Sequence, residues 1–116
     1  MEIAVRIQGH TLIAELVGEL DHHSAKEVKD MVEQGIKSGG VRHLVFDFSR
    51  LSFMDSSGIG VVVGRFKLIS SLGGQVAICG ANRTVDRLLT MSGIKKLIPA
   101  YPTAVSALQH FQEEIS

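Results

Sequence analysis

The sequence predicts one α/β domain in which a mixed sheet of four to five strands packs with about four helices. Two stretches of alternating apolar residues open the chain and are separated by a short turn, which is typical of an antiparallel hairpin. Helical and strand-like segments then alternate, which is typical of parallel strands joined by right-handed crossovers. With 116 residues, 45% of them hydrophobic and 21% charged, the chain is large enough for one domain, 1–116, with its own core.

The hairpin is expected at the start of the chain. Ile3, Val5 and Ile7 recur at every second position, residues 8–10 form the turn, and residues 11–17 are the second strand.

A helix follows, which Asp21 or Ser24 can cap and which Gly39 and Gly40 end. Its apolar positions are three or four residues apart: Ala25, Val28, Val32 and Ile36.

The stretch LSFMDSSGIGVVVGRFK, residues 51–67, is the centre of the prediction. A strand over residues 44–48 leads into a polar turn, and a helix begins at Ser56. At about 100° per residue, this helix has a core-facing stripe, a flank of small residues and an opposite face. The three sets are Ile59, Val62, Val63, Phe66 and Ile69; Ser57, Gly60, Gly64 and Ser71; and Val61, Arg65, Leu68 and Leu72.

The last third of the chain continues the alternation. Residues 75–79 form a strand, a short helix containing Val85, Leu88 and Leu89 stops near Gly93, and residues 97–98 add a brief edge strand. Pro102 or Thr103 opens a last helix. Its expected inward-facing residues are Ala104, Val105, Leu108, Phe111 and Ile115.

Charge and composition exclude several classes of protein. Twelve basic and twelve acidic residues give a formal net charge of zero, without the basic patch that nucleic-acid binding requires. The single cysteine, Cys79, lies in a strand-like run and is expected to be a buried apolar residue. No secretion signal and no run of about 18 apolar residues is present, so we expect a cytoplasmic protein without a membrane segment.

Two turns at the ends of strands suggest a binding site. The second strand runs into Asp21 and the third into Asp55 and Ser56, so both turns are expected at one edge of the sheet. The Ser56 hydroxyl would lie at a helix N-terminus, where unpaired N–H groups stabilise a phosphate. Asp55 either caps this helix, the commoner role, or orients or repels such a phosphate.

Gly60 and Gly64 lie inside the helix, where each costs about 0.5–1 kcal/mol relative to Ala. Close packing on the chain's own sheet and close approach of a partner both account for them, and the sequence leaves the two explanations open.

The sequence gives little support for catalysis or metal binding. A serine hydrolase needs a G-x-S-x-G turn and a downstream histidine base, whereas the string here is M-D-S-S-G-I-G and His110 is the one histidine that follows. Phosphate-binding glycine motifs are missing, and the histidines, Cys79 and carboxylates lack metal-ligand spacing. We therefore expect that this protein is not an enzyme and that it binds no metal ion and no cofactor.

Three stretches, in this order, resemble the anti-sigma factor antagonists of the STAS domain class: GELDHH at 18–23, LSFMDSSGIGVVVGRFK at 51–67 and MSGI at 91–94. The middle stretch is the most specific, and MSGI is weak alone. The resemblance covers essentially the whole chain and is greatest to the antagonists that control the sporulation sigma factor F.

This resemblance implies a non-enzymatic switch. The unphosphorylated antagonist binds an anti-sigma factor that is also a serine kinase, SpoIIAB-like with ATP or ADP bound, and releases the sigma factor. The kinase phosphorylates the serine after the aspartate of D-S-[ST]-G, here Ser56 with Ser57 as its neighbour, and a SpoIIE-like phosphatase of the PP2C class removes the phosphate. We expect a monomer in isolation, with these partner contacts: Asp21, Asp55, Ser56, Ser57, Gly60, Val61, Gly64 and Arg65.

Three alternatives remain. An antagonist of a general stress-response sigma factor would keep Ser56 and change the kinase. A small hydrolase would use Ser56 as nucleophile, and a ligand-binding STAS module would belong to a larger transport or sensory system. ELDHH together with SFMDSSG favours the sporulation antagonist.

Overall fold

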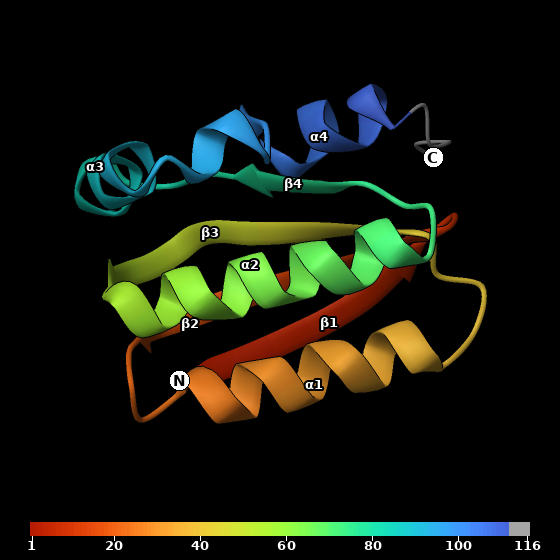
Figure 1. Cartoon of the computed structure of the whole chain (residues 1–116), viewed down its shortest axis with the longest axis horizontal. Helices are drawn as coiled ribbons and strands as arrows, with labels where there is room; N and C mark the ends of the chain where they lie inside the picture. Colours follow the sequence, from red (N-terminus) through yellow and green to blue (C-terminus); the bar gives the residue numbers. More distant parts are fainter. Residues whose placement is uncertain (112–116) are drawn as a thin grey trace.

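The structure, a computed structural model that describes residues 1–111, is built on a five-stranded sheet (Figure 1). β1 (Glu2–Gln8) and β2 (Thr11–Leu20) form the expected antiparallel hairpin. β3 (His43–Met54), β4 (Val76–Cys79) and β5 (Ala100–Tyr101) extend the sheet in the order β1-β2-β3-β4-β5, each parallel to its neighbour. The predicted mixed sheet with an N-terminal hairpin is therefore confirmed.

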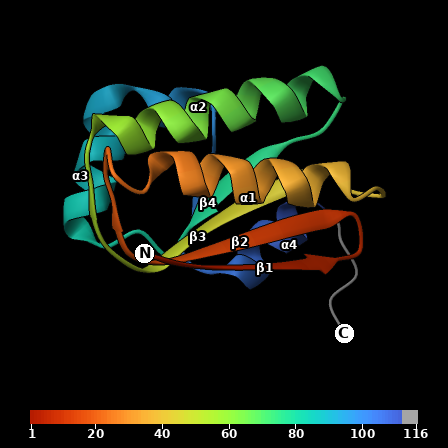
Figure 2. The same cartoon turned by 90° about the horizontal axis from the view of Figure 1, so that it is seen from below.

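Helices cover the two faces of the sheet unequally. α1 (Ala25–Lys37), α2 (Ser56–Ser71) and α3 (Arg83–Ser92) pack on the face that holds the main apolar core. Figure 2 shows α1 and α2 side by side above the strands. α4 (Ala104–His110) covers a smaller core on the other face: Ile13, Val45, Ala77, Cys79, Ala107 and Leu108. Among the described residues, none of the helices combines the length and the apolar character that crossing a bilayer requires.

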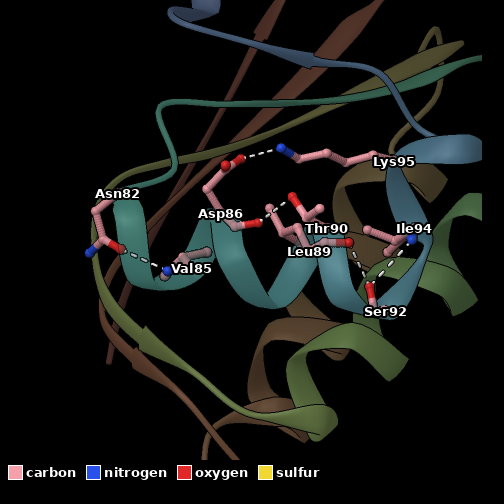
Figure 3. Close-up of polar contacts among 8 residues, drawn as sticks. All are labelled: Asn82, Val85, Asp86, Leu89, Thr90, Ser92, Ile94 and Lys95. Atoms are coloured by element: carbon pink, nitrogen blue, oxygen red, sulfur yellow. Dashed lines mark hydrogen bonds and ion pairs between the residues drawn. The ribbon is translucent and has the colours of Figure 1, made fainter.

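Polar contacts fix α3 to the sheet, and others, drawn in Figure 3, fix it to the segment that follows it. The side chain of Asn82 caps α3, and its Nδ2 also donates to the Leu51 carbonyl of β3 at 3.1 Å. Asp86 of α3 forms an ion pair of 2.5 Å with Lys95 in the 3₁₀ turn η1 (Ile94–Lys96). The bond from Asn82 thus fixes the start of α3 to the second half of β3.

Strand β3 is longer than predicted. The expected polar turn after residue 48 is wrong, because the strand continues to Met54. Leu51 and Met54 are buried, and they lie beside Gly18 and Leu20 of β2. Two register shifts in the β2–β3 pairing break the alternation of buried and exposed residues, which hid the second half of the strand.

The C-terminal predictions need two corrections. The edge strand expected at residues 97–98 is wrong, because Ile98 is buried in the main core and β5 begins only after Pro99. The side chain of Thr103 caps α4, whose buried positions are Ala107 and Leu108. Val105 is half exposed, so its expected inward orientation is also wrong. Ile115 lies outside the described residues.

The outer face of α2 also differs from the prediction. Val62 and Ile69 are fully buried, as the expected core-facing stripe requires. Val61 and Arg65, expected on the opposite face, are also buried, while Leu72 is exposed. The reason is that α1 packs beside α2, so α2 has a second buried face.

Arg65 is the most deeply buried cation of the described chain, with 8% of its surface exposed. Its Nη2 lies 3.2 Å from Oε1 of Glu33 on α1. Among the described residues, its Nε and Nη1 have no hydrogen-bond partner. The guanidinium therefore depends on one carboxylate, and removal of that carboxylate leaves a buried cation without compensation.

We expect Glu33→Ala to lower the free energy of unfolding by about 3 kcal/mol. Arg65→Met removes both the charge and its need for a partner, so its loss should be about 1 kcal/mol. Urea denaturation measures both. Asp30→Ala breaks the exposed Lys26–Asp30 pair on the same helix and serves as the control, with a loss under about 1 kcal/mol. Equal losses for all three variants would contradict the assignment.

Candidate functional site

The candidate site consists of the turns that follow β2 and β3, residues 21–24 and 55–57, here called the paired turns. Leu20 and Met54 lie side by side at the ends of the two strands, and the Leu20 carbonyl accepts the Asp55 N–H at 3.2 Å. The expectation that both turns lie at one end of the sheet is confirmed. α1 and α2 begin directly after them.

The turn after β3 exposes one serine and partly covers the next. Asp55 is the N-cap of α2: its Oδ1 accepts the Ser57 N–H at 2.8 Å, and its carbonyl accepts the Gly58 N–H at 3.0 Å. Ser56 is the first residue of α2 and is exposed, whereas Ser57 is half-buried. The Ser56 hydroxyl is thus accessible at the positive end of a sixteen-residue helix.

The turn after β2 is held by Asp21. Its Oδ1 accepts the N–H groups of His23 and Ser24, at 2.9 and 3.1 Å, and the Ser24 hydroxyl donates to the Glu19 carbonyl at 2.8 Å. The Ser24 N–H is the main reason why the pKa of the Asp21 carboxyl is lowered, although partial desolvation opposes it. Asp21 is therefore a fixed negative charge beside the Ser56 turn.

The glycines of α2 have different surroundings. A Cβ on Gly58 would meet Met54 Cγ at 2.5 Å and Leu20 Cγ at 3.0 Å, so Gly58 allows α2 to start against the ends of β2 and β3. A Cβ on Gly60 or Gly64 would meet no atom within 4 Å outside the helix's own backbone. Close packing on the chain's own sheet therefore does not explain Gly60 and Gly64. The role of Gly58 cannot be seen in the local sequence pattern, because it depends on Leu20, which is far away in the sequence.

The expected contact residues divide into two groups. Asp21, Asp55, Ser56, Ser57 and Gly60 lie at or beside the paired turns, and Gly64 continues the open flank along α2. Val61 and Arg65 were expected there too, but their side chains face α1 and the core and are 7% and 8% exposed.

The histidine that follows Ser56 in the sequence, His110, lies away from it. Among the described residues, no histidine forms a hydrogen bond with Ser56 or Ser57. His110 packs on Tyr101 and Phe111, and Phe111 stacks on His43 at the start of β3, whereas Ser56 follows the other end of that strand. The part of the chain that the structure describes also has no cluster of three or more metal-ligating side chains.

Comparison with known proteins identifies the family. The model of the STAS domain matches residues 2–107. The chain belongs to the STAS domain family. Within it, the chain is 41% identical over 114 residues to the anti-sigma F factor antagonist of Paenibacillus polymyxa, covering 97% of each chain. It is 33% identical over 84 residues to the anti-sigma-B factor antagonist of Listeria monocytogenes, covering 72% of each. It is thus an anti-sigma factor antagonist of the SpoIIAA type, closer to the sigma F version.

Solved structures of STAS proteins share the fold. Unphosphorylated SpoIIAA matches with a TM-score of 0.84 at 28% identity, covering 99% of this chain and all of the other. The phosphorylated form of Bacillus SpoIIAA matches with a TM-score of 0.74 at 28% identity, covering 95% of this chain and 99% of the other.

We expect Gly58→Ala and Gly60→Ala to change stability in opposite directions. The new methyl group at position 58 clashes with Met54 and Leu20, which should lower the free energy of unfolding by about 1–3 kcal/mol. At position 60 it meets open space and favours the helix, which should raise the free energy by about 0.5–1 kcal/mol. Thermal and urea unfolding of the two variants check the prediction, and a destabilised Gly60→Ala would contradict it.

Proposed function

We propose that this STAS protein is a phosphorylation-controlled antagonist of the anti-sigma factor of sigma factor F. Its unphosphorylated form binds the anti-sigma factor, a SpoIIAB-like serine kinase with ATP or ADP bound, and releases the sigma factor. Phosphorylation of Ser56 ends the binding, and a SpoIIE-like phosphatase of the PP2C class reverses it. The observation that carries the proposal is the exposed Ser56 hydroxyl at the N-terminus of α2, beside a fixed carboxylate and an open glycine flank.

The position of Ser56 supports a switch that acts at the surface. A phosphate adds a charge of about −1.5 to −2 and three acceptor oxygens. The N-terminus of α2 stabilises that charge in the free protein, and Ser56 is exposed, so the phosphate does not have to enter the core. In a contact with a partner, the same charge must be desolvated beside Asp21 and Asp55. Phosphorylation should therefore weaken the complex without refolding the domain.

The open flank of α2 supports the proposed contact face: Asp21, Asp55, Ser56, Ser57, Gly60 and Gly64. The missing side chains at Gly60 and Gly64 allow a partner backbone to approach the helix closely. Val61 and Arg65 act from beneath this face, because they hold α2 against the core and α1. Arg65 would thus affect binding by positioning α2.

The proposal assigns no reaction to this chain itself. The phosphoryl group comes from ATP on the kinase, and the phosphatase provides its own metal ions, so the antagonist needs no cofactor. All partners act in the cytoplasm, where sigma factors meet RNA polymerase. The anti-sigma-B antagonists among the relatives support one alternative, in which the partner is the kinase of a general stress-response sigma factor.

Mass spectrometry of the protein after incubation with a SpoIIAB-like kinase and ATP tests the proposed switch. We expect one phosphate on the wild type and on Ser57→Ala, and none on Ser56→Ala, because Ser57 is half-buried and its N–H is held by Asp55. An anti-sigma-B kinase tested in parallel distinguishes the two sigma factors. Phosphate that persists on Ser56→Ala, or that neither kinase adds to the wild type, would contradict the proposal.

Gly60→Ala should weaken binding of the unphosphorylated protein to the anti-sigma factor by about tenfold, because the added methyl group holds the partner backbone away. Calorimetry or surface plasmon resonance measures this loss. The control is Ser70→Ala, an exposed position in the last turn of the same helix, which should bind normally. Since Gly60→Ala is expected to fold more stably than the wild type, weaker binding could not be ascribed to unfolding. Normal binding would remove the flank from the contact face.

A further inference from the structure

The outer edge of β1 is a regular strand without a neighbour among the described residues. β1 has seven residues, contains no proline and pairs with β2 without a register shift. The other edge strand, β5, has only two residues. Proteins usually protect long edge strands with prolines, bulges or charged side chains. β1 has no proline and no bulge, and its two charged residues, Glu2 and Arg6, are of opposite sign, so each can pair with the other in a complementary strand. The edge is therefore suited to pairing with another strand.

Side chains of β1 alternate in character between the two faces. Val5 lies opposite Ala14, which belongs to the core under the helices, so the odd-numbered residues face α1. Arg6 lies opposite Ile13 of the smaller core, so the even-numbered residues face the side of α4. Glu2 and Arg6 are exposed, and neither forms an ion pair with any described residue.

Apolar surface borders this edge on the side of α1. Val5 and Ile7 are 39% and 51% exposed. A hollow of about 410 Å³ lies between them and α1, where Met31 and Gln34 form its other wall. A strand added to β1 would bury these side chains and could insert one apolar side chain into the hollow.

The sequence of β1 is complementary to itself in one antiparallel register. If two copies meet with Ala4 at the twofold axis, Glu2 of each lies opposite Arg6 of the other on one face. On the other face Ile3 lies opposite Val5, and Met1 lies opposite Ile7. We propose that β1 is a self-association edge through which a second copy of this chain pairs, giving a continuous ten-stranded sheet. This departs from the expectation of a monomer in isolation and does not depend on the proposed function.

The position of α1 is compatible with this pairing. α1 contacts both β1 and β2, so its axis lies above the space between them. With strands about 4.8 Å apart, the two α1 helices would be about 10 Å apart, an ordinary helix packing distance. Ser56 starts α2, which packs on β3 and β4, so pairing through β1 leaves the Ser56 turn accessible.

Disulfide formation at engineered cysteines tests the register. Ala4→Cys places two thiols opposite each other at the axis, so mild oxidation should give a covalent dimer. Val5→Cys is the matched control one residue away, and the exposed Thr84→Cys on α3 controls for random collisions. Both should cross-link at least about tenfold more slowly, because their thiols are not directly opposed. The native Cys79 does not compete, since burial and the neighbouring Asp47 raise its pKa to about 12.

Charge variants test the pairing without new thiols. Glu2→Arg alone and Arg6→Glu alone each place like charges opposite each other and should sediment as monomers at concentrations where the wild type dimerises. An equimolar mixture should restore the dimer, because Arg at position 2 of one variant faces Glu at position 6 of the other. Dimer in the mixture and fast cross-linking of Ala4→Cys support the proposal. It is overturned by a wild type that stays monomeric, by fastest cross-linking of Val5→Cys, or by equal rates for all three cysteine variants.

Discussion

The candidate site depends on the pairing of β2 with β3 up to their last residues. Two register shifts near the end of β2 bring Leu20 beside Met54, and the Leu20 carbonyl accepts the Asp55 N–H. This last contact joins the starts of the two following turns. With it, a fixed carboxylate from one turn and an exposed hydroxyl from the other share one edge of the sheet, which is a common position for binding sites in α/β folds.

The start of α2 is fixed by packing as well as by its cap. Asp55 orients the first turn through the Ser57 N–H, but Gly58 decides how closely that turn approaches the sheet. Any side chain at position 58 would push α2 away from Leu20 and Met54 and would move Ser56 with it. Gly60, only two residues later, has no such neighbour. One helix therefore contains a glycine required by its own core and another that the fold does not require.

Local periodicity was enough to predict most of the fold, and the errors occur where distant contacts decide. The alternation in β1 and the spacing of Val28, Val32 and Ile36 in α1 depend on neighbouring residues, and both elements were predicted correctly. The second half of β3 was missed, because its irregular burial results from register shifts against β2. The burial of Arg65 could not be predicted, since its partner Glu33 lies on another helix. Helical periodicity shows which residues of α2 share a face. It does not show that a second helix, α1, also covers one of these faces.

The asymmetry between Ser56 and Ser57 explains why a surface switch suits this site. Ser57 is half-buried, so a phosphate on its hydroxyl would be less accessible than a phosphate on Ser56. Ser56 carries its hydroxyl on the exposed side of the same turn. Because Ser56 is exposed, a phosphate there would add charge to the surface, and we expect the folded domain to be the same in the phosphorylated and unphosphorylated forms. On the proposed mechanism, the difference in binding free energy between the two forms then arises in the complex, where the partner would meet the phosphate in addition to the carboxylates of Asp21 and Asp55.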